Sequence, residues 1–143
     1  MVPTELMFRV TARTDYAVRA LLEVARRHPR AVKGREIAEA QVLPYRFLAS
    51  TMTQLRRGGL LDSRRGGGVD GGYRLARSPE RITLVDVVRV IEGQVVDVRN
   101  PRGSGPSDAS AIWAAVGDGV EQALVSITVA DLLLLTPVDD VAG

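Results

Sequence analysis

Arginine, glycine and aspartate dominate one short stretch of the sequence, residues 60–76, which is LLDSRRGGGVDGGYRLA. Guanidinium groups bind phosphate oxygens through charge-assisted hydrogen bonds, and glycine adopts the positive φ angles that a tight hairpin loop requires. Two short apolar runs flank the tip, so we expect a β-hairpin that presents Arg64, Arg65 and Arg74 to the phosphates or the minor groove of a nucleic acid. A solvated surface hairpin is the alternative.

Two helices joined by a tight turn are expected directly before this hairpin. The first spans about 34–40, and the second opens at Pro44 and ends at a left-handed cap on Gly58 or Gly59. Its inner face is predicted to be Phe47, Leu48, Thr51, Met52 and Leu55, and its outer face Arg46, Ser50, Thr53, Gln54 and Arg57. A helix-turn-helix followed by a hairpin has the layout of a winged helix.

Three further helices are expected around this unit. One runs from a cap at Thr11 or Thr14 to about Arg27, and another begins at Thr83 with a capping box to Asp86. A long helix from 107 or 108 to 126 has an apolar stripe of Ile112, Trp113, Val116, Val120, Leu124 and Ile127. The winged helix would already have its own core, so this stripe favours dimerisation over packing on its own domain. A short apolar turn, 132–135, follows a second capping pattern.

Composition and charge limit the function classes. No run approaches the roughly 18 apolar residues of a bilayer span, no signal-peptide layout is present, and the 143 residues contain no cysteine, so we expect a cytoplasmic protein without membrane contact. Residues 1–81 hold 16 Lys and Arg against 8 Asp and Glu, a balance of +8. Residues 82–143 hold 3 against 9, a balance of −6. The basic half is the one expected to attract a polyanion.

Catalysis is not expected. One histidine, no cysteine and no paired carboxylates in an apolar setting leave little acid–base or nucleophilic machinery. The glycine run lacks the Gly-Lys-Ser/Thr ending of a phosphate-cradling loop. The alternative to a nucleic-acid-binding protein is therefore a winged-helix module that recognises another protein and does not bind DNA directly.

The order and spacing of these segments resemble one known family. The segments RVTARTDYAVRALLEVA, REIAEAQVLPYRFLASTMTQLRRGGLLDSRRG, GGYRLARSPERITLVDVVRVIEG and IWAAV…SITVADLL are similar to the Rrf-two family of bacterial winged helix-turn-helix transcriptional regulators, over about residues 7–135. The resemblance implies a mainly α fold with a small β-hairpin wing and a long C-terminal dimerisation helix. It also implies a homodimer that binds a near-palindromic operator in double-stranded DNA, acting as a repressor.

Four departures from the family pattern affect these expectations. Many members hold an iron–sulfur cluster on three cysteines in a loop before the long helix, but the same loop here, about 97–110, has none, so no cofactor is expected. Lys33 replaces the usual Ser or Thr cap of the helix-turn-helix, and Ala49 replaces a common acidic residue of the recognition helix. The wing tip is a residue or two longer than usual.

The expected organisation has five parts. Residues 1–6 form an unstructured leader, 7–97 the DNA-binding domain, 98–106 the loop at the cluster position, 107–136 the dimerisation helix with a short terminal helix, and 137–143 a tail. The expected DNA contacts are Arg13, Tyr45, Arg46, Ser50, Thr53, Arg57, Arg64, Arg65 and Arg74. A regulatory signal would be a small molecule in a pocket near Trp113, Ile91 and Val95, a partner protein, or no signal at all. For these three apolar residues, a place in the core is the favoured interpretation over a pocket.

Overall fold

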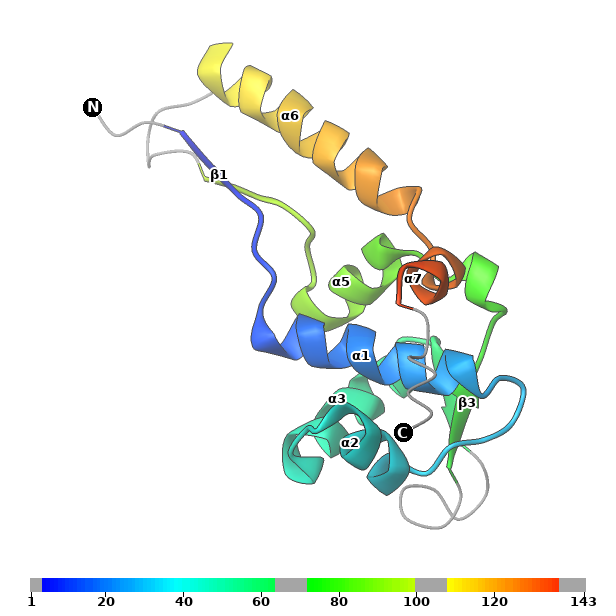
Figure 1. Ribbon diagram of the computed structural model, residues 1–143. Helices are drawn as coiled ribbons and strands as arrows, with labels where there is room; N and C mark the ends of the chain where they lie inside the picture. Colours follow the sequence, from blue (N-terminus) through cyan, green and yellow to red (C-terminus); the bar gives the residue numbers. More distant parts are fainter. Residues whose placement is uncertain (1–3, 64–71, 100–107, 137–143) are drawn as a thin grey trace.

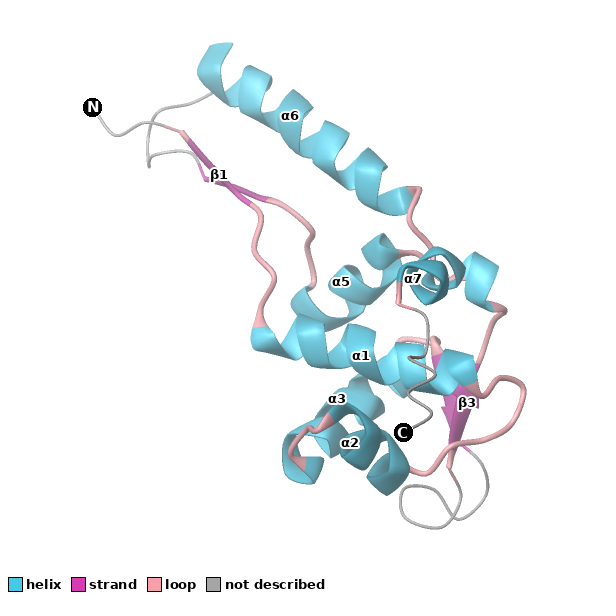
Figure 2. Cartoon of the chain, in the orientation of Figure 1, coloured by secondary structure: helices cyan, strands magenta, loops and turns pink. Residues whose placement is uncertain are grey.

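The computed structural model describes residues 4–63, 72–99 and 108–136. Helices make up most of this part of the chain, and two small pairs of strands accompany them (Figure 2). The expected fold class, a mainly helical winged helix-turn-helix with a long C-terminal helix, is confirmed. Among the described residues, no helix is long and apolar enough to cross a bilayer.

The first helix, α1 (Ala12–Arg26), crosses the centre of the molecule (Figure 1). Thr11 caps it as predicted, because its hydroxyl oxygen accepts a hydrogen bond from the Thr14 amide at 3.2 Å. It ends before the His28–Pro29 bond, and His28 is exposed. Apolar residues at helical spacing, among them Ala17, Leu21 and Val24, are almost fully buried. α1 is therefore the helix around which the core is built.

Helices α2 (Gly34–Gln41) and α3 (Tyr45–Arg57) form the helix-turn-helix on one side of α1 (Figure 1). Lys33 makes no side-chain capping bond to α2, as the sequence indicated. Pro44 is the residue before the first turn of α3 and not, as predicted, within it. Gly59 supplies the left-handed conformation after α3 with φ 81°, whereas Gly58 keeps φ −77°.

The wing consists of strands β2 (Leu61–Ser63) and β3 (Tyr73–Leu75), which pair antiparallel with Asp62 opposite Arg74. Val32, just before α2, pairs with Tyr73 through two backbone hydrogen bonds of 2.7 and 2.8 Å. The wing base is therefore attached to the helix-turn-helix. The tip, including Arg64 and Arg65, lies outside the described residues.

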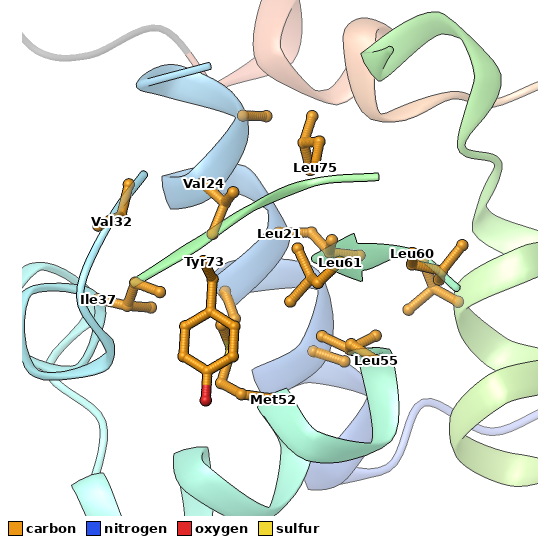
Figure 3. Close-up of a cluster of buried hydrophobic side chains, with 14 of the residues drawn as sticks. Leu21, Val24, Val32, Ile37, Met52, Leu55, Leu60, Leu61, Tyr73 and Leu75 are labelled. Carbon is orange, nitrogen blue, oxygen red and sulfur yellow. The ribbon is translucent and has the colours of Figure 1, made fainter. Parts of the chain in front are cut away.

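One hydrophobic core joins α1, α2, α3 and the two wing strands (Figure 3). Its buried side chains come from every one of these elements, and those that are fully buried include Leu21, Ile37, Leu48, Met52, Leu55 and Leu61. At about 25 cal/mol per Å² of apolar surface removed from water, each of these side chains contributes roughly 1.5–3 kcal/mol relative to an exposed position. The core holds α3 from behind and leaves its opposite face in solvent.

One 3-10 turn and two helices complete this body. A 3-10 turn, η1 (Pro79–Arg81), precedes α5 (Leu84–Glu92), and α7 (Val129–Leu135) ends the described chain. Both helices begin with the predicted capping boxes, Thr83 with Asp86 and Thr128 with Asp131. A β-bridge between Thr83 and Thr128 joins the two caps, and Val129 enters the core. α7 thus packs against α1 and η1.

The remaining elements extend away from the body as an arm (Figure 1). Strand β1 (Glu5–Met7) pairs antiparallel with β4 (Asp97–Arg99), and α6 (Asp108–Val125) lies along this pair. The expectation of an unstructured leader over 1–6 is therefore wrong for Glu5 and Leu6, because backbone pairing with β4 orders them. Most of the cluster-position loop, 100–107, lies outside the described residues.

Candidate nucleic-acid interface

Helix α3 presents a polar face away from the core. Leu48, Thr51, Met52 and Leu55 are buried as predicted, while Arg46, Ser50 and Arg57 are exposed. Thr53 is half-buried, and its hydroxyl donates to the Ala49 carbonyl at 3.0 Å. These three predicted contacts give α3 two guanidinium groups and one hydroxyl with which to meet phosphates and base edges, and Arg56 adds a third exposed guanidinium group.

Phe47 corrects one of the sequence predictions. It was expected on the inner face of α3, but 61% of its surface is exposed. Its carbonyl accepts a hydrogen bond from the buried Thr51 hydroxyl at 3.2 Å. Because successive residues turn by about 100° around a helix, Phe47 falls between the buried and the outer faces, on a flank that periodicity alone assigns to either.

Tyr45 lies on a different flank of α3 and has contacts of its own. The Arg35 guanidinium stands over its ring, 5.5 Å from the ring centre, and a Cβ added at Gly34 would approach the ring within 3.3 Å. Tyr45 is half-buried and packs against the core. The ring thus joins α2 to α3 through its contact with Arg35 and its close approach to Gly34. The contact of Tyr45 with DNA stays a prediction.

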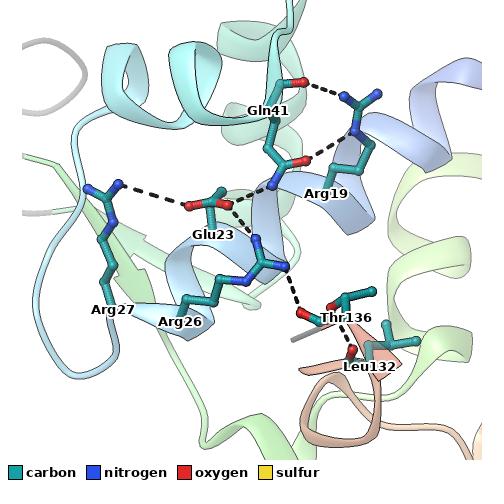
Figure 4. A network of polar contacts seen from close by, with 7 residues as sticks. All are labelled: Arg19, Glu23, Arg26, Arg27, Gln41, Leu132 and Thr136. Carbon is teal, nitrogen blue, oxygen red and sulfur yellow. Dashed lines mark hydrogen bonds and ion pairs between the residues drawn. The ribbon is translucent and has the colours of Figure 1, made fainter. Parts of the chain in front are cut away.

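The turn between α2 and α3 is held to α1 by a polar network (Figure 4). Arg19 donates to both the side chain and the carbonyl of Gln41, and Gln41 donates in turn to Glu23 at 2.7 Å. Val42, which follows, has the left-handed φ of 53° that reverses the chain. These bonds fix the angle at which α3 leaves the turn. The roles of Arg19, Glu23 and Gln41 could not be predicted from the sequence, since these residues interact across different elements.

Glu23 is also the centre of a set of contacts that reach α7. It is 7% exposed and forms ion pairs with Arg26 at 2.5 Å and Arg27 at 4.0 Å. Arg26 donates a second hydrogen bond to the Thr136 carbonyl at 3.0 Å, at the end of α7 (Figure 4). A buried carboxylate requires such partners, and here they join the helix-turn-helix to α7.

A second polar cluster fixes the start of α1. Glu92, at the end of α5, accepts hydrogen bonds from the hydroxyls of Thr11 and Thr14. The Thr11 hydrogen bond is the largest influence and lowers the pKa of Glu92. Burial, the next largest, opposes it, and the Thr14 hydrogen bond and nearby arginines add to the lowering, so the pKa lies below its usual range. Arg13 donates to the Ile91 carbonyl at 3.5 Å. Arg13, a predicted phosphate contact, is exposed in the first turn of α1. Its hydrogen bond to Ile91 of α5 positions the guanidinium group.

At the wing, the structure describes only the base. Arg74 is half-buried in β3, next to Tyr73, whose ring is buried beneath the wing. Burial and, to a smaller extent, Tyr45 raise the pKa of Tyr73, so its phenol is neutral at physiological pH. Arg64 and Arg65 lie outside the described residues, and their predicted DNA contacts stay predictions.

The apolar stripe of α6 divides into two halves. Ile112, Trp113 and Val116 are exposed, whereas Val120, Leu124 and Ile127 are half-buried. Leu124 packs on a small cluster of Val85, Val88 and Val95, so this end of the stripe has the intrachain partner that the sequence analysis did not expect. Of the three residues considered for a signal pocket, Ile91 belongs to the main core and Val95 to this cluster, as the core interpretation expects, whereas Trp113 is exposed and belongs to neither.

Comparison with known proteins places the chain in a family. It matches the Rrf2 family, described as iron-dependent transcriptional regulator, over residues 10–134. A Mycobacterium tuberculosis (strain H37Rv) protein assigned as an HTH-type transcriptional regulator is 36% identical, covering 87% of this chain and 80% of that protein. The structure of CymR, the global cysteine regulator of B. subtilis, has a TM-score of 0.79 at 30% identity, covering 91% of this chain and 99% of that one. T. potens IscR has a TM-score of 0.73 at 31% identity, covering 95% and 93%.

The family description names iron, and the donor set of this chain does not fit an iron–sulfur cluster. Such clusters are held mainly by cysteine thiolates, and the sequence contains no cysteine and one histidine, His28. In the described ranges no three His, Cys, Asp or Glu side chains gather in a way that could hold a metal ion.

These comparisons agree with the geometry of the described elements. The helix-turn-helix, the wing base and the long α6 are arranged as in solved Rrf2-type structures, and the relatives are regulators of transcription and not enzymes. The family assignment thus confirms the expectation of a DNA-binding regulator without catalytic activity. The chain belongs to the Rrf2 family of winged helix-turn-helix transcriptional regulators.

Proposed function

We propose that this regulator acts as a homodimer that represses transcription by occupying a near-palindromic operator. Each α3 enters a major groove, and the two half-sites lie about 10 base pairs apart, centre to centre. The single observation that supports this most is the exposed polar face of α3, with Arg46, Ser50 and Arg57 held outward by a fully packed inner face.

Base reading and backbone binding are divided among these residues. Arg46, near the start of α3, is suited to bidentate hydrogen bonds with a guanine, while Ser50, Thr53 and Tyr45 approach neighbouring bases or phosphates. Arg57 at the end of α3, Arg13 at the start of α1 and the wing arginines Arg64, Arg65 and Arg74 bind phosphates. The basic balance of residues 1–81 favours the same side for the polyanion.

The exposed half of α6 supports the dimer. Ile112, Trp113 and Val116 place three large apolar side chains in solvent along one helix, and such a patch on a soluble protein is typical of an interaction surface. A second α6 would cover it. No cofactor is proposed, because the chain has no cysteine; a regulatory signal would come from a small molecule or a partner protein.

The competing function is a winged-helix module that binds another protein, with the wing as the peptide-binding edge. Salt separates the two, because neutralising several phosphates releases counterions and makes the affinity fall steeply with salt concentration, whereas an apolar peptide site is little affected. The arginines of α3 and the wing favour DNA.

The test is fluorescence anisotropy on the promoter fragment of the protein's own gene and on a scrambled copy, from about 50 to about 300 mM salt. Tight, selective binding that weakens steeply with salt is expected. Arg46→Ala should cost about 1–3 kcal/mol and relax sequence preference, while Arg57→Ala should weaken all sequences similarly and flatten the salt slope. Equal losses on both DNAs in both variants would exclude the assigned base-reading role of Arg46.

A further inference from the structure

Phe47 is a large apolar side chain in a position where the DNA-reading helix meets solvent. It follows Arg46 directly and lies one helical turn before Ser50, both of which are exposed. The residue behind it, Leu48, is fully buried, so Phe47 is not needed to close the core. The Phe47 ring is 61% exposed beside the polar face of α3, so it is accessible to a molecule bound on that face.

A hollow of about 360 Å³ opens beside this ring, between the start of α1 and α3. Its walls are made by Ala12, Arg13 and Tyr16 of α1 and by Phe47, Ser50 and Thr51 of α3. The lining is mainly aromatic and aliphatic, with the Arg13 guanidinium and the Ser50 hydroxyl as its exposed polar groups. The hollow is continuous with the exposed face of α3.

We propose that a thymine of each half-site places its 5-methyl group against the Phe47 ring in this hollow, which makes Phe47 a specificity-determining residue. This inference rests on the proposed binding of α3 in the major groove. The thymine methyl is the apolar group that base pairs present there, and apolar side chains recognise it by contact. Arg13 and Ser50 meet the phosphate backbone at the rim of the same hollow.

The arrangement favours DNA over a peptide as the occupant because the hollow adjoins Arg46 and contains Arg13. A hydrophobic peptide segment offers no anionic group to the two neighbouring guanidinium groups, whereas a nucleotide offers a methyl group to the ring and a phosphate to the arginine. Arg46 then selects a guanine and Phe47 a thymine on neighbouring steps of one half-site.

The experiment begins with an operator selected from random duplexes by the wild-type protein. Each thymine is then replaced singly by uracil, which removes only the 5-methyl group, and Kd is measured for the wild type and for Phe47→Ala. At one position per half-site, uracil should weaken wild-type binding about fourfold, the factor that burial of one methyl group supplies. Phe47→Ala should bind the thymine and uracil duplexes equally.

Val42→Ala is the matched control, since Val42 is an exposed apolar residue at the turn before α3 and does not line the hollow. This variant should keep the wild-type difference between thymine and uracil. Circular dichroism checks that Phe47→Ala is folded, which its exposure leads us to expect.

The possible results distinguish failure of the thymine contact from failure of the proposed operator binding. Selective operator binding with no uracil position that depends on Phe47 overturns the thymine contact and leaves the proposed function intact. Equal loss of affinity by Phe47→Ala on thymine and uracil duplexes, with the uracil effect preserved, overturns it as well. Failure to enrich any sequence from the random duplexes overturns the operator-binding function together with the inference that depends on it.

Discussion

Helices α1 and α6 are of similar length but differ in what they bury. α1 has 15 residues, of which eight are buried, whereas α6 has 18 residues, and Gly117 is the buried one. Both helices have apolar stripes at helical spacing. The buried face of α1 packs within the chain, while Ile112, Trp113 and Val116 of α6 stay 41–57% exposed. A hydrophobic stripe therefore predicts burial but does not say in which molecule.

Because α1 and α6 differ in burial, the body and the arm should be stabilised in different ways. The body around α1 has one continuous core built from seven helices and strands. Among the described residues, α6 contacts chiefly α5, including two valines of the small cluster, and the β1–β4 pair. The body should fold in a single chain. The arm should become rigid when a second copy covers Ile112, Trp113 and Val116, as the proposed dimer requires.

Leu21→Ala should give the largest effect. Leu21 is 1% exposed in the centre of the core, and removal of a fully buried leucine side chain lowers the free energy of unfolding by about 2–5 kcal/mol. Urea denaturation followed by circular dichroism measures this loss, which should be the same at every protein concentration. A loss that changes with concentration would mean that the body does not fold independently of the arm.

Trp113→Ala should act on association instead. An exposed tryptophan on an interface typically contributes about 2 kcal/mol or more, so self-association should weaken by about 30-fold. Sedimentation equilibrium measures the monomer–dimer constant, and Ala109→Ser, near the start of α6, is the matched control that should leave it unchanged. An unchanged constant in Trp113→Ala would place the dimer contact elsewhere.

Alanine at two glycines should have opposite effects in the two regions. At Gly58 a Cβ would lie 2.5 and 2.7 Å from the two methyl groups of Val90, a stiff β-branched side chain, so Gly58→Ala should destabilise the body by about 1–3 kcal/mol. At Gly119 nothing lies within 4 Å, and Gly119→Ala should stabilise α6 by up to about 1 kcal/mol. Thermal denaturation of both variants tests the pair. A lower melting temperature for Gly119→Ala would show that its face of α6 is covered by a partner.

The smallest expected effect depends on pH. The pKa of Glu92 is lowered in the folded protein by the Thr11 and Thr14 hydroxyls, so its contribution to stability is complete above the ordinary glutamate pKa, about 4.3. It is lost as the pH falls through the lower, folded-state value. The difference in unfolding free energy between wild type and Glu92→Gln should therefore shrink from pH 6 toward pH 3. A difference independent of pH would contradict the role assigned to the ionised carboxylate.

Local signals in the sequence were sufficient for most of the body. The caps at Thr11, Thr83 and Thr128 were predicted and are formed, because capping depends on residues three positions apart. The inner face of α3 was predicted except for Phe47, which lies on a flank between two faces. The exposed polar residues of α3 were also identified, though their contacts with DNA stay predictions.

Contacts between segments that lie far apart in the chain could not be predicted from the sequence. Strands β1 and β4 are three residues each and lie far apart in the chain, so neither has the alternating pattern of a longer strand. The packing of Leu124 on Val85 and Val88 and the hydrogen bonds around Glu23 depend on how whole helices are placed. Periodicity within one helix contains no information on that placement.

The bridge between Thr83 and Thr128 has a consequence for synthesis of the protein on the ribosome. The Leu84 amide donates to the Ile127 carbonyl, and the Val129 amide donates to the Ile82 carbonyl, at 2.9 and 2.8 Å. Val129 then fills a place in the core beside α1. The nascent DNA-binding body therefore cannot close its core until the residues after α6 have left the ribosomal exit tunnel. Translation that stops within α6 would yield an incompletely folded chain, a substrate for proteases, and not a monomeric competitor for the operator.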